Sequence, residues 1–201
     1  PGDWKQGHWP YNAAAIGERG RVFVFQSHGS LAPGEFRWAF GYLTEGGFRW
    51  HFRATPIAYR CCYSYIFPGP EDGLTLLSNR DVLWETLGRK TPEGTTFRYV
   101  FNAVNIWRTD DVFDAPLRRV CRFQEPVAES YEGKPVCYAR DAYVDTSGRI
   151  HVLYDRQGAS TDGKVERRHA LVVDGSVVRD RETPEGAGKF RAFSAGTKPY
   201  S

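Results

Sequence analysis

Residues 62–68, Cys-Tyr-Ser-Tyr-Ile-Phe-Pro, and residues 74–80, Leu-Thr-Leu-Leu-Ser-Asn-Arg, decide the fold of this chain. Both runs are rich in apolar and aromatic residues, and the acidic, glycine-containing segment Glu-Asp-Gly at 71–73 separates them. Two such runs joined by a short turn that contains glycine are typical of a β-hairpin. The sequence therefore predicts two antiparallel strands here.

The same arrangement occurs twice more, in residues 11–28 and in residues 138–156. In each copy a tyrosine lies nine or ten residues before the turn glycine, and a polar or ionisable side chain closes the second run. The turn glycines are Gly20, Gly73 and Gly148, the tyrosines are Tyr11, Tyr63 and Tyr138, and the closing residues are His28, Arg80 and Asp155 or Arg156. The chain therefore contains an internal repeat of a hairpin.

Composition favours strands, because six Trp, eleven Tyr and thirteen Phe occur among the 201 residues and aromatic side chains are enriched in sheets. The chain is long enough to bury a sizeable core. Its net charge of +3 is small, and the basic residues are spread along the chain, so no nucleic-acid partner is expected. No run is long and apolar enough to form a membrane-spanning helix, so no membrane partner is expected.

The four cysteines are Cys61, Cys62, Cys121 and Cys137. They lack the paired short spacing of a zinc site, so neither a metal nor another cofactor is predicted. Adjacent residues of a strand point to opposite faces, so at most one of Cys61 and Cys62 would meet Cys121 or Cys137. We expect four buried packing thiols, with one disulfide as the alternative.

In chain order, strands and turns alternate almost throughout. After a lead-in loop over residues 1–10, the first repeat is followed by aromatic-rich strands at 36–42 and 48–53, and then a new copy begins. Four short antiparallel strands before each new copy are the plan of a propeller blade. We expect an all-β partial β-propeller over residues 11–183 and a loop over residues 184–201. The expected four-stranded antiparallel blades, about three in number, are residues 11–55, 56–135 and 136–183, the second with a long excursion over residues 105–133.

Three blades leave two apolar sheet faces uncovered, because known propellers close a ring of about four to eight blades. We therefore expect the chain to be a fragment of a longer propeller, whose remaining blades are missing here or supplied by another copy. The sequence begins at Pro1 without an initiator methionine and shows no signal peptide. The true N-terminus is expected to lie upstream, and the protein is expected to be extracellular or periplasmic.

Several short segments resemble one family. Residues 44–50, Thr-Glu-Gly-Gly-Phe-Arg-Trp, resemble the Asp-box turn of sialidase-type repeats, with Glu45 in place of its aspartate and Arg49 in place of its threonine. Val-Phe-Gln-Ser-His-Gly, Tyr-Ser-Tyr before a proline, Leu-Leu-Ser-Asn-Arg and Tyr-Ala-Arg follow in the order of the BNR-repeat (sialidase-like) propellers. That group includes ulvan-lyase-type polysaccharide lyases. The likeness covers about residues 8–180.

This resemblance implies a carbohydrate-active protein, and more finely a polysaccharide lyase that cleaves uronate-containing glycans by β-elimination. Such an enzyme neutralises the C6 carboxylate, removes the C5 proton and protonates the departing C4 oxygen. By position, the implied catalytic residues are His28, Tyr63 and Arg80, where arginine suits the carboxylate because its planar fork makes two bonds. The implied substrate-binding residues are Tyr11, Asn12, Tyr65, Tyr138 and Arg140. Tyr11 stands where the family carries a histidine, and the expected partner is an acidic polysaccharide or oligosaccharide.

Each catalytic candidate also has a structural explanation. His28 precedes a glycine and can bond a turn carbonyl, and Asp81 can neutralise Arg80. Tyr63 and Tyr65 would share one face of a regular strand, where aromatic packing between blades explains one of them. A non-catalytic glycan-binding or scaffold propeller is therefore the alternative function.

A sialidase-type glycoside hydrolase is the third hypothesis. It requires an arginine triad, for which Arg80, Arg140 and Arg156 are the candidates. It also requires a nucleophilic tyrosine and an acid/base aspartate. The hypotheses differ in which of these side chains converge on one end of the propeller.

Overall fold

The computed structural model describes residues 12–17, 22–28, 37–54, 61–83, 99–125, 136–158 and 161–184. These ranges consist of strands and turns and contain no α-helix. Accordingly, none of them holds a helix with the length and apolar character needed to span a membrane.

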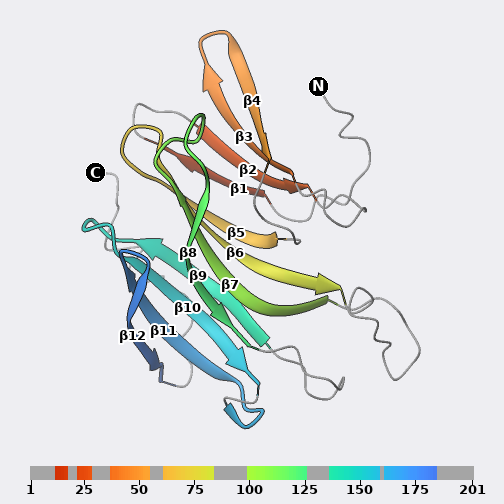
Figure 1. Cartoon of the computed structure of the whole chain (residues 1–201), viewed down its shortest axis with the longest axis vertical. Helices are drawn as coiled ribbons and strands as arrows, with labels where there is room; N and C mark the ends of the chain where they lie inside the picture. Colours follow the sequence, from red (N-terminus) through yellow and green to blue (C-terminus); the bar gives the residue numbers. More distant parts are fainter. Residues whose placement is uncertain are drawn as a thin grey trace. The chain divides into compact units, whose positions relative to one another are not determined.

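The described strands form three four-stranded antiparallel sheets, each with its strands in sequence order (Figure 1). The first sheet contains β1 (Asn12–Ile16), β2 (Val22–His28), β3 (Arg37–Thr44) and β4 (Gly47–Ala54). The second contains β5 (Cys61–Pro68), β6 (Leu74–Leu83), β7 (Tyr99–Thr109) and β8 (Arg118–Gln124). The third contains β9 (Val136–Val144), β10 (Ile150–Gln157), β11 (Glu166–Val173) and β12 (Ser176–Glu182). The predicted all-β fold is confirmed, and each of the three predicted hairpins opens a separate sheet.

Turn chemistry explains where strands of the third sheet reverse. Asp174 and Gly175 both have positive φ, 48° and 79°, as a type I′ turn between β11 and β12 requires. In the turn between β9 and β10, Asp145 accepts hydrogen bonds from the backbone N–H groups of Ser147 and Arg149, at 2.9 and 3.0 Å. The guanidinium of Arg149 also donates to Asp145, at 2.7 Å. The Asp145 carboxylate therefore adds to two backbone hydrogen bonds, from Asp145 N–H to the Arg149 carbonyl and from Gly148 N–H to the Asp145 carbonyl, in closing the turn.

The prediction of an excursion outside the strands over residues 105–133 is wrong for residues 105–109 and 118–124. Residues 105–109 continue β7, and residues 118–124 form β8. The side chains of Asn102 and Asn105 interrupt the apolar run, yet both lie fully buried inside β7. A tight turn follows, in which the Thr109 hydroxyl donates to the Asp111 carbonyl at 2.7 Å. Polar residues in a buried central strand therefore hid the strand from the sequence pattern.

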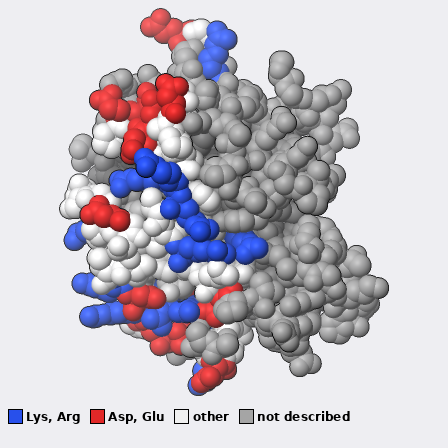
Figure 2. All heavy atoms as spheres, in the orientation of Figure 1, with Lys and Arg blue, Asp and Glu red and all other residues white. Residues whose placement is uncertain are grey.

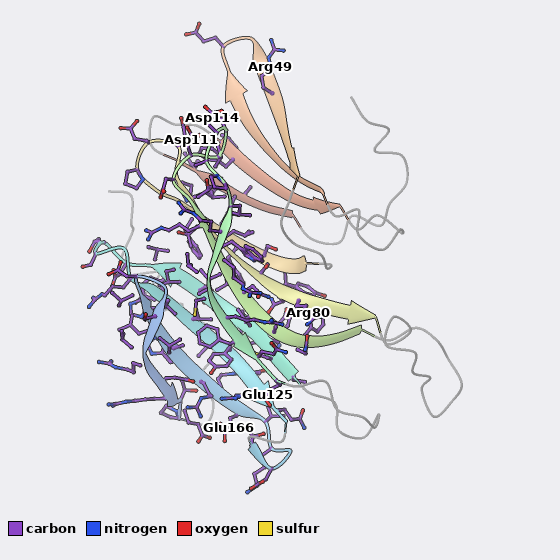
Figure 3. All side chains as sticks on the ribbon, in the orientation of Figure 1. Arg49, Arg80, Asp111, Asp114, Glu125 and Glu166 are labelled. Atoms are coloured by element: carbon purple, nitrogen blue, oxygen red, sulfur yellow. The ribbon has the colours of Figure 1, made fainter. Side chains whose placement is uncertain are left out.

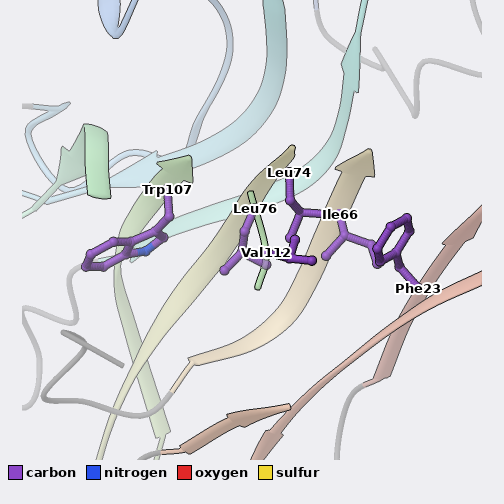
Figure 4. Close-up of a cluster of buried hydrophobic side chains, with 6 residues drawn as sticks. All are labelled: Phe23, Ile66, Leu74, Leu76, Trp107 and Val112. Carbon is purple, nitrogen blue, oxygen red and sulfur yellow. The ribbon is translucent and has the colours of Figure 1, made fainter. Parts of the chain in front are cut away.

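The chain divides into two compact units, residues 1–80 with 106–119 and residues 81–105 with 120–201. In the first unit, apolar side chains from β2, β5, β6, β7 and the turn after β7 form one buried cluster (Figure 4). Its members are Phe23, Ile66, Leu74, Leu76, Trp107 and Val112. Gly17 permits this packing, because a Cβ at that position would collide with the Phe23 ring.

The second unit has its own core, in which the ring of Phe123 packs on that of Tyr154 at 4.9 Å between centroids. Val104, Val152 and Val172 are also almost wholly buried. Cys121 and Cys137 are free thiols, and burial raises the pKa of Cys137 to about 12. The side chains of Cys61 and Cys62 lie outside the described part of the structure.

Candidate functional site

A row of polar and aromatic side chains crosses three strands of the third sheet. Asp155 of β10 lies directly opposite Tyr138 of β9 and Arg167 of β11. Residues directly opposite one another in adjacent strands project to the same face of a sheet. The antiparallel register therefore gathers these three side chains into one row.

Asp155 anchors this row. Its side chain is 3% exposed and accepts a hydrogen bond from Arg140 Nε at 2.6 Å and from Arg167 Nε at 2.8 Å. Burial raises the pKa of the Asp155 carboxyl, but the hydrogen bonds and charges of Arg167 and Arg140 outweigh burial, so the pKa lies below its ordinary value. The group is therefore a carboxylate at neutral pH, and its role is to hold two arginines rather than to transfer protons.

Aromatic surface adjoins the arginines. The Arg140 guanidinium carbon lies 5.0 Å from the centroid of the Tyr138 ring, and the Phe101 ring packs edge-on against Tyr138 at 5.1 Å. The side chain of Arg140 is 49% exposed and that of Arg167 is 35% exposed. An aromatic ring beside exposed guanidinium groups can bind a ligand that carries both an apolar face and oxygen acceptors.

Bulges interrupt the edge strands that carry the predicted tyrosines. In β9 the register shifts between the pairs Asp141–Leu153 and Ala139–Tyr154, which leaves Arg140 as the additional residue. In β5 it shifts between Cys62–Asn79 and Tyr65–Leu77. A bulge re-aims side chains and is frequent beside functional sites. Both edge strands therefore depart from regular alternation where the sequence analysis placed its candidates.

The bulge in β5 changes the expected relation between Tyr63 and Tyr65. Regular alternation would give them one face, but Tyr63 lies in the left-handed region with a φ of 47° and is exposed, whereas Tyr65 is half-buried. Arg80 pairs across the ladder with Cys61 and lies near the end of β6 (Figure 3). Tyr63 and Arg80 thus belong to one hairpin, as predicted.

The remaining candidates divide between described and undescribed parts of the chain. Tyr138 and Arg140 lie in contact in β9, as the cation-π geometry above shows. Asn12 and His28 lie in β1 and β2, where only their backbone is described, and His28 pairs with Arg37. Tyr11 lies outside the described residues. Their proposed roles stay predictions.

Arg140 and Arg156 do not converge. Arg140 is paired with Asp155, whereas Arg156 is hydrogen-bonded to the fully buried carboxylate of Glu125. Asp155 and Arg156 are consecutive in β10, so their side chains project to opposite faces of the sheet. Two members of the proposed sialidase triad are therefore bound to different carboxylates on different faces.

Sequence reasoning missed Glu125 and Arg167. Glu125 follows β8 (Figure 3), and its backbone is held by Asn102, whose side-chain amide donates to the Glu125 carbonyl at 3.2 Å. Gly158 leaves room for the Glu125 carboxylate, because a Cβ there would overlap it. The signal in the sequence was the alternation of Cys121, Phe123 and Glu125, which assigns the carboxylate to the buried face.

On the visible described surface, Lys and Arg form a band across the middle, Asp and Glu gather above it, and both signs lie together at the lower edge (Figure 2). Within the described residues, no group of three or more His, Cys, Asp or Glu side chains has the geometry to hold a metal ion. The row around Asp155 is therefore the strongest candidate site, and it lies wholly within the second unit.

The antiparallel four-stranded sheets define the class of this protein as a β-propeller, and solved structures agree. An α-L-arabinanase of Penicillium chrysogenum complexed with arabinobiose has a TM-score of 0.56 and 14% identity, over 90% of this chain and 51% of its own. The GH93 α-L-arabinofuranosidase of Fusarium graminearum with arabinobiose has a TM-score of 0.54 and 10% identity, over 90% and 50%. An endo-arabinase of Bacteroides thetaiotaomicron has a TM-score of 0.50 and 18% identity, over 90% and 63%.

At these identities the likeness establishes the fold alone. This chain spans about half to under two thirds of the length of these neighbours. No protein-family model and no curated protein matches the sequence. The propeller predicted from the repeated hairpins is confirmed, while membership of the BNR-repeat group or of a lyase family is not shown.

Proposed function

We propose that the protein is a carbohydrate-binding β-propeller whose third sheet contacts an oligosaccharide through Tyr138, Arg140 and Arg167. The observation that carries this proposal is the Tyr138 ring beside an Arg140 guanidinium that Asp155 anchors. Aromatic rings stack on the apolar faces of sugars, and guanidinium groups donate hydrogen bonds to hydroxyl and carboxylate oxygens. The arabinobiose in two of the structural neighbours supports an oligosaccharide as the ligand class.

The row supports binding better than hydrolysis. Glycoside hydrolysis commonly needs one carboxylic acid with a raised pKa and a second carboxylate beside the scissile bond. Asp155 has a lowered pKa and is almost inaccessible, so neither role suits it. Glu125 is fully buried and bonded to Arg156, which likewise suits an internal anchor.

Titration with glycans tests this proposal. Isothermal titration calorimetry compares neutral arabino-oligosaccharides with uronate-containing oligosaccharides against the parent protein, Tyr138→Ala and Arg140→Gln. We expect each variant to bind about tenfold more weakly, the effect of losing one charge-assisted bond or one stacking contact. A parent protein that binds neither glycan class would refute the proposal.

Arg149→Gln is the matched control. Arg149 and Arg140 lie in the same hairpin, their side chains are each 49% exposed, and each donates its Nε to an aspartate, at 2.7 and 2.6 Å. Arg149 lies at the turn, away from Tyr138 along the strand. Equal weakening in Arg149→Gln and Arg140→Gln would mean that loss of an ion pair, not loss of a ligand contact, causes the effect.

A polysaccharide lyase is the second candidate, and the conformation of Tyr63 favours it. Residues held in sparsely populated backbone regions cluster at active sites, and Tyr63 combines a φ of 47° with an exposed phenol. In this proposal His28, Tyr63 and Arg80 act on an acidic polysaccharide. Release of an unsaturated uronate, followed by its ultraviolet absorbance, tests it, and retention of activity in both Tyr63→Phe and Arg80→Lys would eliminate it.

We also propose that the protein acts outside the cytoplasm, because a polysaccharide is too large to cross a membrane unaided. Fractionation of cells that express the complete gene tests this location. Recovery in the cytoplasmic fraction alone would contradict it.

A further inference from the structure

Tyr63 has a backbone conformation that its position in the chain does not explain. Four non-glycine residues of the described part have positive φ: Tyr63, Glu71, Asp162 and Asp174. Three of them lie in turns, where such values are common, but Tyr63 lies within β5. Bulky side chains rarely adopt the left-handed region, so something in the surrounding structure must hold Tyr63 there.

The register of the hairpin shows where the constraint arises. Cys62 pairs with Asn79 and Tyr65 pairs with Leu77, so β5 carries one residue more than β6 over this interval. The additional residue must be accommodated by a bulge at Tyr63 and Ser64. Without a further constraint, the bulge could lie at several positions along the strand, because each of them accommodates one additional residue in β5.

Asn79 supplies a constraint at one position. Its side chain is 0% exposed, and its Nδ2 donates a hydrogen bond to the Tyr63 carbonyl oxygen at 3.1 Å. A buried amide that loses its acceptor leaves a desolvated donor, so this bond disfavours other positions of the bulge. Its neighbours in β6, Leu77 and Ser78, are also 0% exposed, which leaves the Asn79 side chain little room to move.

We propose that Asn79 is a positioning residue for Tyr63. By bonding the Tyr63 carbonyl, it fixes the left-handed bulge and so holds Tyr63 at the surface, where the residue is 36% exposed. The inference concerns a residue that makes no ligand contact of its own. It rests on the second candidate function, the polysaccharide lyase, only in assigning the Tyr63 ring to contact with a glycan.

A double-mutant cycle tests the positioning without any ligand. Glycine adopts a φ of 47° without steric cost, so Tyr63→Gly removes the need for an anchor. We expect Asn79→Ala to lower the urea midpoint in the parent and to lower it by less than half as much in the Tyr63→Gly background. Equal losses in the two backgrounds would overturn the proposal, because independent sites add.

Asn102→Ala is the matched control for this cycle. Asn102 is another buried asparagine, 1% exposed, whose Nδ2 donates to a backbone carbonyl, that of Glu125. Its loss should lower the midpoint equally in both backgrounds. If Asn79→Ala does not fold, a second comparison tests the proposal. Tyr63→Gly should lower the urea midpoint less than Tyr65→Gly, because only position 63 has the positive φ that glycine adopts without strain. The reverse order would overturn the proposal.

A spectroscopic arm reports on the ring itself. Protein labelled with fluorotyrosine gives a ¹⁹F resonance that Tyr63→Phe assigns, and this resonance should shift in Asn79→Ala but not in Asn102→Ala. An unchanged Tyr63 resonance in Asn79→Ala would show that Asn79 is structural only.

Glycan titration then separates the two claims. Asn79→Ala should weaken binding of uronate-containing oligosaccharides, the ligands of the lyase candidate, about as much as Tyr63→Ala, and the pair of changes should be no worse than either alone. If the parent binds glycan and the cycle shows no coupling, the role of Asn79 is refuted. If the cycle shows coupling and the parent binds no uronate-containing oligosaccharide, the lyase candidate fails and the positioning of Tyr63 stands.

Discussion

Replacing Asp155 by Asn provides the sharpest test of how the row in the third sheet is held together. The substitution keeps the side-chain shape and removes the charge that two arginines share. Arg167 donates through Nε at 2.8 Å and through a terminal nitrogen at 3.3 Å, and Arg140 donates through Nε at 2.6 Å. The variant therefore turns three charge-assisted contacts into weaker ones and places an amide N–H₂ against a guanidinium.

The magnitude follows from exposure. Hydrogen bonds to charged groups contribute about 1.5–3 kcal/mol when buried, whereas exposed ion pairs contribute about 0–1 kcal/mol. Asp155 is 3% exposed in its side chain, but Arg140 and Arg167 are 49% and 35% exposed and can turn to water. We therefore expect a loss of about 2 kcal/mol in the free energy of unfolding, or about 4–8 °C in Tm.

The stabilisation by Asp155 depends on pH in a direction that follows from its lowered pKa. The folded pKa of Asp155 is lower than the unfolded pKa, so its stabilisation is fully present above about pH 4 and is lost as pH falls through the folded value. Urea denaturation followed by circular dichroism should show a constant difference between parent and Asp155→Asn from pH 5 to 8, which shrinks in acid. Asp162→Asn, at an exposed turn, is the control. Equal stability of Asp155→Asn and the parent at pH 7 would refute the anchoring role.

Three further predictions concern the second unit. Gly158→Ala should cost about 1–3 kcal/mol in urea denaturation, because its Cβ meets the Glu125 carboxylate, and the cost should vanish in a Glu125→Ala background. Tyr154→Phe should cost about 1–2 kcal/mol by the same assay, since the buried Tyr154 hydroxyl donates to Asp180 at 2.8 Å; an unchanged midpoint would contradict this. Burial raises the pKa of Asp145, but the hydrogen bonds in its turn outweigh burial and lower the pKa to about 2. Asp145→Asn should therefore be less stable than the parent above pH 4 by about 1–2 kcal/mol, with the difference lost towards pH 2; a pH-independent difference would contradict the assignment.

The elements that could be predicted are those whose signals are local. Turn glycines and the tyrosine spacing identified three hairpins, because a tight turn restricts the residues that it can contain. The Asp174-Gly175 pair is a sequence that favours a type I′ turn, and both residues have the positive φ values that this turn needs. These features depend on a few neighbouring residues, so the sequence displays them directly.

The elements that were missed depend on residues far apart in the chain. The predicted excursion began at residue 105 and so excluded the end of β7, where Asn105 is buried. In the same strand, the buried Asn102 amide donates to the carbonyl of Glu125, 23 residues later. Glu125 in turn is bonded to Arg156, 31 residues further on. Burying a polar group costs free energy unless the group is hydrogen-bonded. A local sequence pattern does not show which distant residue supplies that hydrogen bond.

The candidate site was predicted in part for the same reason. Tyr138 and Arg140 were identified from their place in the repeat, and they do lie together. The anchoring of Arg140 by Asp155 depends on the bulge in β9, which adds one residue to a single strand. Bulges are set by register between two strands, so a one-strand pattern contains no sign of them.

The two bulges have a consequence for solubility. β5 and β9 each form one edge of their sheet, and a flat edge strand is a template on which strands of other molecules can assemble into aggregates. A bulge breaks the even spacing of N–H and C=O groups and twists the edge, so an incoming strand finds no continuous ladder. At the opposite edge of the third sheet, β12 exposes Val177 and Val178 but continues with four charged residues, 179–182. The bulges that orient Tyr63 and Arg140 therefore also disfavour intermolecular strand pairing at the edges formed by β5 and β9.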